Sequence, residues 1–164
     1  MIIVLYDGQC MFCEGWVRLV IRHTNAKNIK FLPIQFSGIE LSDLLLNSEV
    51  PSMVVIESGK NETYFDARAS IVVMKTLGWG MNVLAHILSL IPTFVVDYFY
   101  RVIGRNRYLI FGRSDICELP TNVDKSFFVS NSEEAQTLFY NESVDVSELN
   151  DMIKLKYIDI VGRG

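Results

Sequence analysis

The sequence predicts an α/β fold, and two observations lead to that prediction. A short apolar run rich in β-branched residues, at 2–5, is followed by a turn and a helical segment at 11–23. Further along, two strand-like runs at 52–57 and 63–65 flank a Ser-Gly-Lys-Asn turn, the pattern of a β-hairpin. The 164 residues, 50% of them hydrophobic, are enough for one domain with a sizeable core.

The elements of the first half have clear local signals. The segment at 11–23 repeats its apolar residues at helical spacing, which predicts an amphipathic helix. Residues 29–34 form a second predicted strand, in which Pro33 indicates an edge strand or a bulge. A short helix is expected at 39–46, before the hairpin.

The hairpin leads into a predicted helix at 66–77, with Asp66 as its N-cap and Gly78 at its end. A long helical stretch is expected next, at 82–103. The predicted order is therefore β-α-β-α-β-β-α followed by further helix. A β-α-β start joined to a β-hairpin and a helix is the thioredoxin-like order, which we predict here.

Charge divides the chain unevenly and indicates its organisation. Residues 1–120 hold 11 acids and 11 bases, whereas residues 121–164 hold eight acids and four bases. We predict a thioredoxin-like domain at 1–120, with a helical elaboration at 82–120, and an acidic C-terminal appendage at 121–164. In the appendage, the pattern at 144–153 permits a short amphipathic helix.

Composition also excludes several classes of protein. The net charge of −4 argues against a basic nucleic-acid binder. Three cysteines are too few for a disulfide-stapled scaffold, and the first residues lack the basic start of a signal peptide. The most apolar stretch, 83–99, is interrupted by polar residues, so no membrane-spanning helix is expected. We expect a cytoplasmic protein.

The strongest chemical signal is the pair Cys10 and Cys13, which follows the first strand at the start of the first helix. Two thiols at this spacing can form a disulfide, and the helix N-terminus favours a thiolate on the first of them. We therefore predict thiol–disulfide exchange, with Cys10 as the nucleophile and Cys13 as the resolving cysteine.

Other interpretations of the two cysteines remain open. They could be half of a metal or iron–sulfur site, although the remaining candidates Cys117, His23 and His86 lack the usual spacing for zinc. They could also pack as small apolar side chains in a non-enzymatic binding module with the same fold. Our prediction includes no metal and no cofactor.

Three blocks of sequence resemble one known family. The opening block at 6–13 resembles the YDGxCxxC start of the DCC family of predicted thiol–disulfide oxidoreductases. The block at 31–35 is similar to that family's second-strand segment, and the block at 104–117 looks like its closing RNR…FG…C pattern. The resemblance covers about residues 2–120. It implies a thioredoxin-like fold and redox use of Cys10 and Cys13, without implying a substrate.

Several neighbours of the dithiol are candidates for supporting roles. Asp7 could accept the proton of Cys13 or could bind the backbone N–H groups of the turn around Gly8. Pro51 precedes the predicted third strand, where a cis-proline would present backbone groups to an extended substrate. Cys117 is either an alternative resolving thiol or a packing residue.

Arg105 and Arg107 belong to a basic stretch that could bind an anionic substrate or simply form a solvated helix end. As partners we expect a protein or low-molecular-weight disulfide and a cellular thiol as electron donor, with no nucleic acid.

Overall fold

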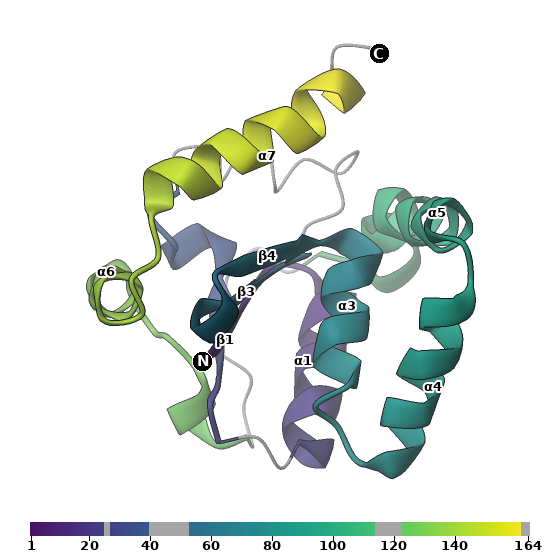
Figure 1. Ribbon diagram of the computed structural model, residues 1–164, viewed down its shortest axis with the longest axis horizontal. Helices are drawn as coiled ribbons and strands as arrows, with labels where there is room; N and C mark the ends of the chain where they lie inside the picture. Colours follow the sequence, from purple (N-terminus) through teal and green to yellow (C-terminus); the bar gives the residue numbers. More distant parts are fainter. Residues whose placement is uncertain (25–26, 40–52, 114–122, 162–164) are drawn as a thin grey trace.

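Four strands form one mixed sheet in the order β2-β1-β3-β4, with helices on both faces (Figure 1). The computed structural model describes residues 1–24, 27–39, 53–113 and 123–161. β1 pairs in parallel with β2 and antiparallel with β3, which in turn pairs antiparallel with β4. The strands are β1 (Ile2–Tyr6), β2 (Ile29–Pro33), β3 (Met53–Glu57) and β4 (Glu62–Phe65).

Six helices are described, together with short 3₁₀ turns that follow β2, connect β3 to β4 and precede α6. They are α1 (Met11–His23), α3 (Asp66–Met74), α4 (Trp79–Leu90), α5 (Thr93–Phe111), α6 (Ser132–Asn141) and α7 (Val146–Val161). This topology has the thioredoxin-like arrangement that the sequence predicts.

The first half of the chain follows the sequence prediction closely. The helix at 11–23 has the predicted bounds, and β2 is an edge strand, as Pro33 indicates. The predicted hairpin forms, with a 3₁₀ turn at Ser58–Lys60 and Asn61 in the left-handed region at φ 53°. The predicted helix at 39–46 lies outside the described residues, apart from Ile39.

The helix after the hairpin differs from the prediction at both ends. It begins at Asp66, after an N-cap at Phe65, so Asp66 is not the cap. The Asp66 carboxylate is buried and accepts a hydrogen bond from the Tyr157 hydroxyl at 2.7 Å instead. The helix ends at Met74, and Gly78 is the N-cap of α4 rather than the end of α3.

The predicted stretch at 82–103 is two helices, with a break before Pro92. Proline lacks a backbone N–H and disfavours helical geometry in the preceding residue. Ile91 accordingly has extended backbone angles, φ −74° and ψ 136°, and α5 then runs on to Phe111. The basic stretch thus lies on the second half of α5.

No single described helix is long and apolar enough to cross a membrane. Together α4 and α5 have the length and composition of a span, but their axes are bent by 114° at the break.

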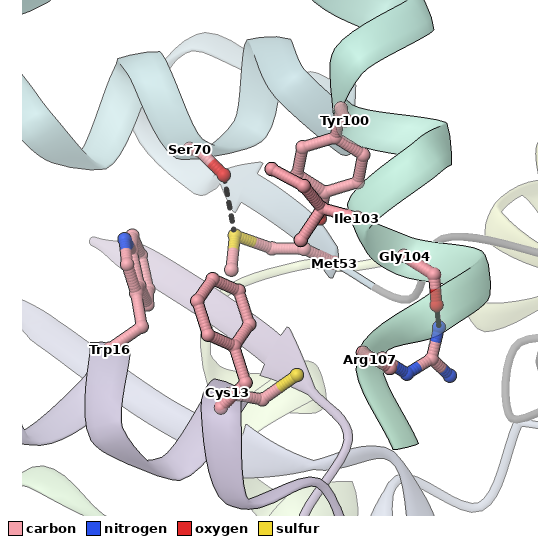
Figure 2. Close-up of a pocket in the computed structure, with 9 residues that line it drawn as sticks. Cys13, Trp16, Met53, Ser70, Tyr100, Ile103, Gly104 and Arg107 are labelled. Atoms are coloured by element: carbon pink, nitrogen blue, oxygen red, sulfur yellow. Dashed lines mark hydrogen bonds between the residues drawn. The ribbon is translucent and has the colours of Figure 1, made fainter. Parts of the chain in front are cut away.

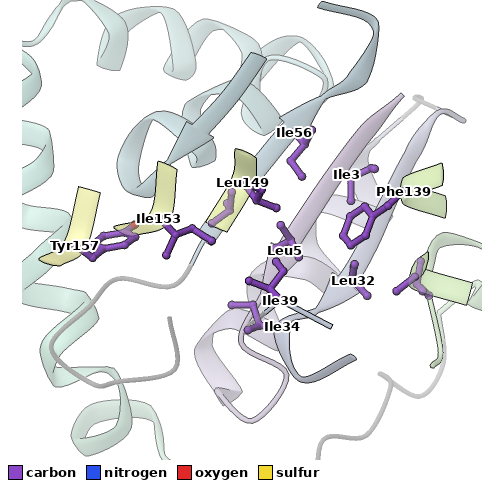
Figure 3. Close-up of a cluster of buried hydrophobic side chains, with 13 residues drawn as sticks. Ile3, Leu5, Leu32, Ile34, Ile39, Ile56, Phe139, Leu149, Ile153 and Tyr157 are labelled. Carbon is purple, nitrogen blue, oxygen red and sulfur yellow. The ribbon is translucent and has the colours of Figure 1, made fainter. Parts of the chain in front are cut away.

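The sheet separates two apolar cores. On one face, side chains of α1 and α3 such as Val17, Val20 and Val73 pack against Val4 and Val55. On the other face, α6 and α7 cover the sheet (Figure 3). The second core contains Ile3, Leu5, Leu32, Ile34 and Ile56 from the first part of the chain, and Phe139, Leu149, Ile153 and Tyr157 from the acidic segment.

The acidic segment therefore docks on the sheet, and its apolar side chains complete the core. The predicted helix at 144–153 is present as the longer α7. Whether residues 121–164 form a separate unit stays a prediction.

Candidate functional site

The two cysteines lie at the first turn of α1, as the sequence predicts. Cys10 is the N-cap, and its sulfur accepts the backbone N–H of Cys13 at 3.3 Å. Cys10 is 1% exposed, whereas Cys13 is partly exposed. Neither forms a disulfide with the other in this structure. A cysteine at the N-cap receives hydrogen bonds and the helix dipole, both of which favour its thiolate.

The two thiols differ in acidity. Hydrogen bonding with Cys13 lowers the pKa of the Cys10 thiol, and the nearby Arg107 charge acts in the same direction, against burial and the charge of Asp7. The pKa of Cys13 is raised well above its usual range, first by its hydrogen bond to Cys10 and then by burial. Such a pair has one thiol ready to attack and one that keeps its proton until the second step.

A buried ion pair lies directly behind the dithiol. Asp7 and Arg107 are 0% and 2% exposed, and Nη2 of Arg107 is 3.4 Å from the Asp7 carboxylate. The hydroxyl of Tyr108 donates to the same carboxylate oxygen, and Arg107 also donates to the Gly104 carbonyl at 3.1 Å. The guanidinium thus neutralises the charge that would otherwise oppose a thiolate on Cys10.

The other Asp7 oxygen organises the turn before Cys10. It accepts the backbone N–H of Gln9 at 3.0 Å and the side-chain amide of Gln35 at 3.1 Å. Gln35 in turn accepts the backbone N–H of Gly8 at 3.2 Å. The turn-binding role of Asp7 is therefore visible in the structure, while its role as a proton acceptor stays a prediction.

The segment after α5 lies over the dithiol turn. Arg113 forms an isolated antiparallel bridge with Cys10 and donates to the Gln9 side chain at 2.7 Å. Phe111 stacks on Phe12, with ring centroids 4.5 Å apart. Gly112 has φ 87°, and a Cβ there would lie 3.2 Å from the Met11 sulfur. Only glycine suits this position, which accounts for the Phe-Gly pair in the third block.

A cavity of about 180 Å³ opens beside Cys13 (Figure 2). Its walls come from α1, β3, α3 and α5, and they are mostly apolar. Figure 2 shows Trp16 on one side and Tyr100, Ile103 and Arg107 of α5 on the other, with Met53 and Cys13 between them. The Ser70 hydroxyl donates to the Met53 sulfur at 3.3 Å. The cavity can hold an apolar group next to the dithiol.

The predicted site residues have different places in the structure. Cys10, Cys13, Asp7, Gly8 and Arg107 come together. Arg105 is exposed on α5, two residues from Arg107 but away from the ion pair.

Pro51 and Cys117 lie outside the described residues, so their predicted roles stay predictions. In the described part of the chain, no group of three or more His, Cys, Asp or Glu side chains is placed to hold a metal ion.

The sequence interpretation did not assign roles to Gln35, Tyr108 or the apolar walls of the cavity. Gln35 and Tyr108 are in the second and third resembling blocks, but nothing in their spacing showed that they meet Asp7, 28 and 101 positions away in the chain. The cavity residues come from four elements and carry no motif. One or more described residues of each block, namely Asp7, Gln35 and Tyr108, thus meet in one hydrogen-bonded cluster.

This fold and this site define a class: a thioredoxin-like protein with a Cys-x-x-Cys dithiol at the start of its first helix. Residues 4–113 match the family model of the DCC1-like thiol-disulfide oxidoreductases, and the chain belongs to that family. It is 35% identical over 122 residues to a chloroplastic DCC family protein of Arabidopsis thaliana, covering 71% of this chain and 69% of the relative. It is 32% identical over 134 residues to the uncharacterized protein YuxK of Bacillus subtilis, covering 77% and 93%. No solved structure gives a significant match.

Proposed function

We propose that this protein exchanges disulfides with a protein or low-molecular-weight substrate, using Cys10 as the nucleophile and Cys13 as the resolving thiol. The observation that carries the proposal is the position of Cys10 at the N-cap of α1, where its sulfur accepts the backbone N–H of Cys13. Hydrogen bonding with Cys13 also lowers the pKa of the Cys10 thiol. Membership of a family described as thiol-disulfide oxidoreductases supports the same chemistry.

The exchange has two steps. The Cys10 thiolate attacks one sulfur of the substrate disulfide, forming a mixed disulfide and releasing one substrate thiolate. Cys13 then loses its proton and attacks the Cys10 sulfur, which releases the second substrate thiol. The substrate disulfide gains two electrons, and Cys10 and Cys13 become a disulfide. A cellular thiol donor returns these electrons.

Access to Cys10 requires a local movement. Because Cys10 is 1% exposed, a substrate disulfide reaches its sulfur only after the covering chain moves. Among the described residues, Arg113 covers Cys10 through a backbone bridge. The hydrogen bond from its side chain to Gln9 is exposed to solvent. Opening this short contact costs little compared with opening the core. The apolar cavity beside Cys13 then offers a place for a substrate side chain.

A redox titration with two variants tests the proposal. The intact protein is equilibrated against a graded dithiol buffer, its thiols are trapped by alkylation, and mass spectrometry maps the modified cysteines. We expect one two-electron transition that maps to Cys10 and Cys13. Cys10→Ser should reduce exchange to the uncatalysed rate, whereas Cys13→Ser should accumulate mixed disulfides. Equal exchange by the wild type and both variants, or thiols that stay reduced throughout, would refute the assignment.

A further inference from the structure

The outer sides of α4 and α5 expose large apolar side chains. The six most exposed are Trp79, Leu90, Phe94, Tyr98, Leu109 and Ile110, which range from 63% for Ile110 to 86% for Trp79. We call this surface the α4–α5 face. Soluble monomers rarely leave so many neighbouring large apolar side chains in water, and patches of this kind mark interaction sites.

The exposed apolar residues of α4 are not the edge of a single apolar stripe that faces the core. In α4, Ala85 is buried on the inner side, while Leu84, Ile87 and Leu90 are exposed on the rest of the helix. A helix that is apolar nearly all round is expected in a large core or in contact with lipid. In α5, Gly104 and Arg107 form the buried inner side, and Phe94, Tyr98 and Leu109 are exposed.

The distribution of charge indicates which kind of partner binds the α4–α5 face. Residues 67–113 hold six basic residues and a single acid, Asp97. One of the six, Arg107, is paired with Asp7, but Arg68, Lys75, Arg105 and Arg113 are exposed. The other side of the sheet carries the acidic α6–α7 segment. The protein is therefore electrically polarised, with its basic side around the exposed apolar residues, which suits a negatively charged apolar surface.

The geometry of the two helices also suits binding to a negatively charged apolar surface. Their axes meet at an angle of 114°, so they do not form a straight span, but two helices that meet at a break can both lie parallel to one surface. Exposed apolar side chains continue through the break, at Leu90, Ile91 and Phe94. Both helices lie outside the layer of α1 and α3, on the opposite side of the molecule from α6 (Figure 1).

From these observations we propose that the α4–α5 face docks on the surface of a lipid bilayer that contains anionic lipids. The exposed apolar side chains enter the boundary between headgroups and acyl chains, and Arg105 with its basic neighbours contacts the phosphates. Neither helix crosses the bilayer.

Docking in this way brings the dithiol close to the membrane. Ile103 is both a wall of the Cys13 cavity and a partly exposed residue of α5. The stack of Phe12 on Phe111 joins the dithiol turn to the end of α5. If the proposed thiol exchange holds, its substrates are then reached at the membrane surface; the docking itself does not depend on that activity.

Vesicle flotation of the full chain tests the proposal. We expect binding to vesicles of phosphatidylcholine mixed with phosphatidylglycerol, and much weaker binding to phosphatidylcholine alone. Leu90→Glu and Phe94→Glu should each lower the affinity at least about tenfold, because each removes one large apolar side chain from the bilayer. Arg105→Gln should lower it about fivefold on the anionic vesicles only.

Leu155→Glu is the matched control. Leu155 is 84% exposed, about as much as Leu90, but it lies on α7. Its replacement should leave vesicle affinity unchanged. A second readout uses the two tryptophans of the chain: in a Trp16→Phe background, Trp79 is the remaining one, and its emission should shift to shorter wavelength on the anionic vesicles.

Three results would overturn the proposal. The first is the absence of flotation with both vesicle types, and the second is an equal loss of affinity in Leu90→Glu and Leu155→Glu. The third is a dimer in sedimentation velocity without lipid that Leu90→Glu dissociates, since the α4–α5 face would then be covered by a second copy of the chain. Vesicle flotation and the emission of Trp79 do not depend on the thiols. A failure of the exchange assay and a failure of docking are therefore distinguishable.

Discussion

Two pairs of helices, α6 with α7 and α4 with α5, differ in whether their apolar side chains are buried or exposed. In α6 and α7, Phe139, Leu149, Ile153 and Tyr157 are buried against the sheet, and the exposed sides are largely polar and acidic. In α4 and α5, many apolar side chains face the solvent and few are buried.

The difference lies in how apolar residues are arranged along each helix. In α7, Leu149, Ile153 and Tyr157 follow each other at intervals of four, so they form one stripe that fits the sheet. In α4, apolar residues occur on nearly every side, so packing against α3 covers only part of them. The acidic segment thus contributes an apolar stripe to the second core, whereas the more apolar α4 and α5 leave many of their side chains exposed.

We expect the largest change in stability from replacing Arg107, because this residue anchors the inner side of α5. Arg107→Met removes the partner of a buried carboxylate, and we expect a loss of roughly 3–5 kcal/mol in the free energy of unfolding. Arg105→Met, two positions along the same helix and exposed, should cost less than about 0.5 kcal/mol. Urea unfolding measures both.

The double variant Asp7→Asn/Arg107→Met sharpens this test. It removes both charges, so it should recover part of the stability that Arg107→Met alone loses. Similar stability of Arg105→Met and Arg107→Met would show that α5 is not anchored by the ion pair.

The next largest effect is expected in the acidic segment. Ile153 is 0% exposed in the second core, and Ile153→Ala should destabilise the protein by about 3 kcal/mol through lost burial and a cavity. Leu155→Ala, two residues further on the exposed side of α7, should change stability by less than about 0.5 kcal/mol. Thermal and urea unfolding of the full chain would measure the difference. If the two variants behave alike, α7 is not part of the cooperative core.

Local patterns predicted the fold because they depend on near neighbours. The apolar run of β1, the spacing in α1 and the hairpin turn each report on a few adjacent residues, and they fix the order of elements. The break at Pro92 was also a local signal, but it was not used to divide the predicted stretch at 82–103. The dithiol could be placed at the first turn of α1 for the same reason.

Contacts between distant segments were not predictable in this way. Arg107 meets Asp7 across 100 positions, and either a solvated helix end or an anion site would suit its place in the sequence equally well. The burial of the acidic segment was equally hidden, because net charge reports on the exposed sides of α6 and α7 and not on the stripe between them. Only the fold shows which side of a helix meets the sheet.

A smaller, pH-dependent effect is expected where α7 meets the rest of the fold, at the contact between Asp66 on α3 and Tyr157 on α7. Burial raises the pKa of Asp66 to about 6, against 3.8 for the unperturbed group. The folded protein therefore binds more protons than the unfolded chain between these values, so the contribution of Asp66 to stability is greatest at low pH and is lost as pH rises from about 4 to about 6.

Asp66→Asn isolates this contribution, because the amide oxygen can still accept the Tyr157 hydroxyl while it carries no charge. Between about pH 4 and pH 7, the stability of the wild type should fall relative to that of the variant by roughly 2–3 kcal/mol. Urea unfolding at the two pH values measures this change, and Asp151→Asn on the exposed side of α7 serves as the control for removing a surface carboxylate. A wild type and an Asp66→Asn variant that differ by the same amount at both pH values would mean that the pKa of Asp66 is not raised, and therefore that α7 does not bury this carboxylate in solution.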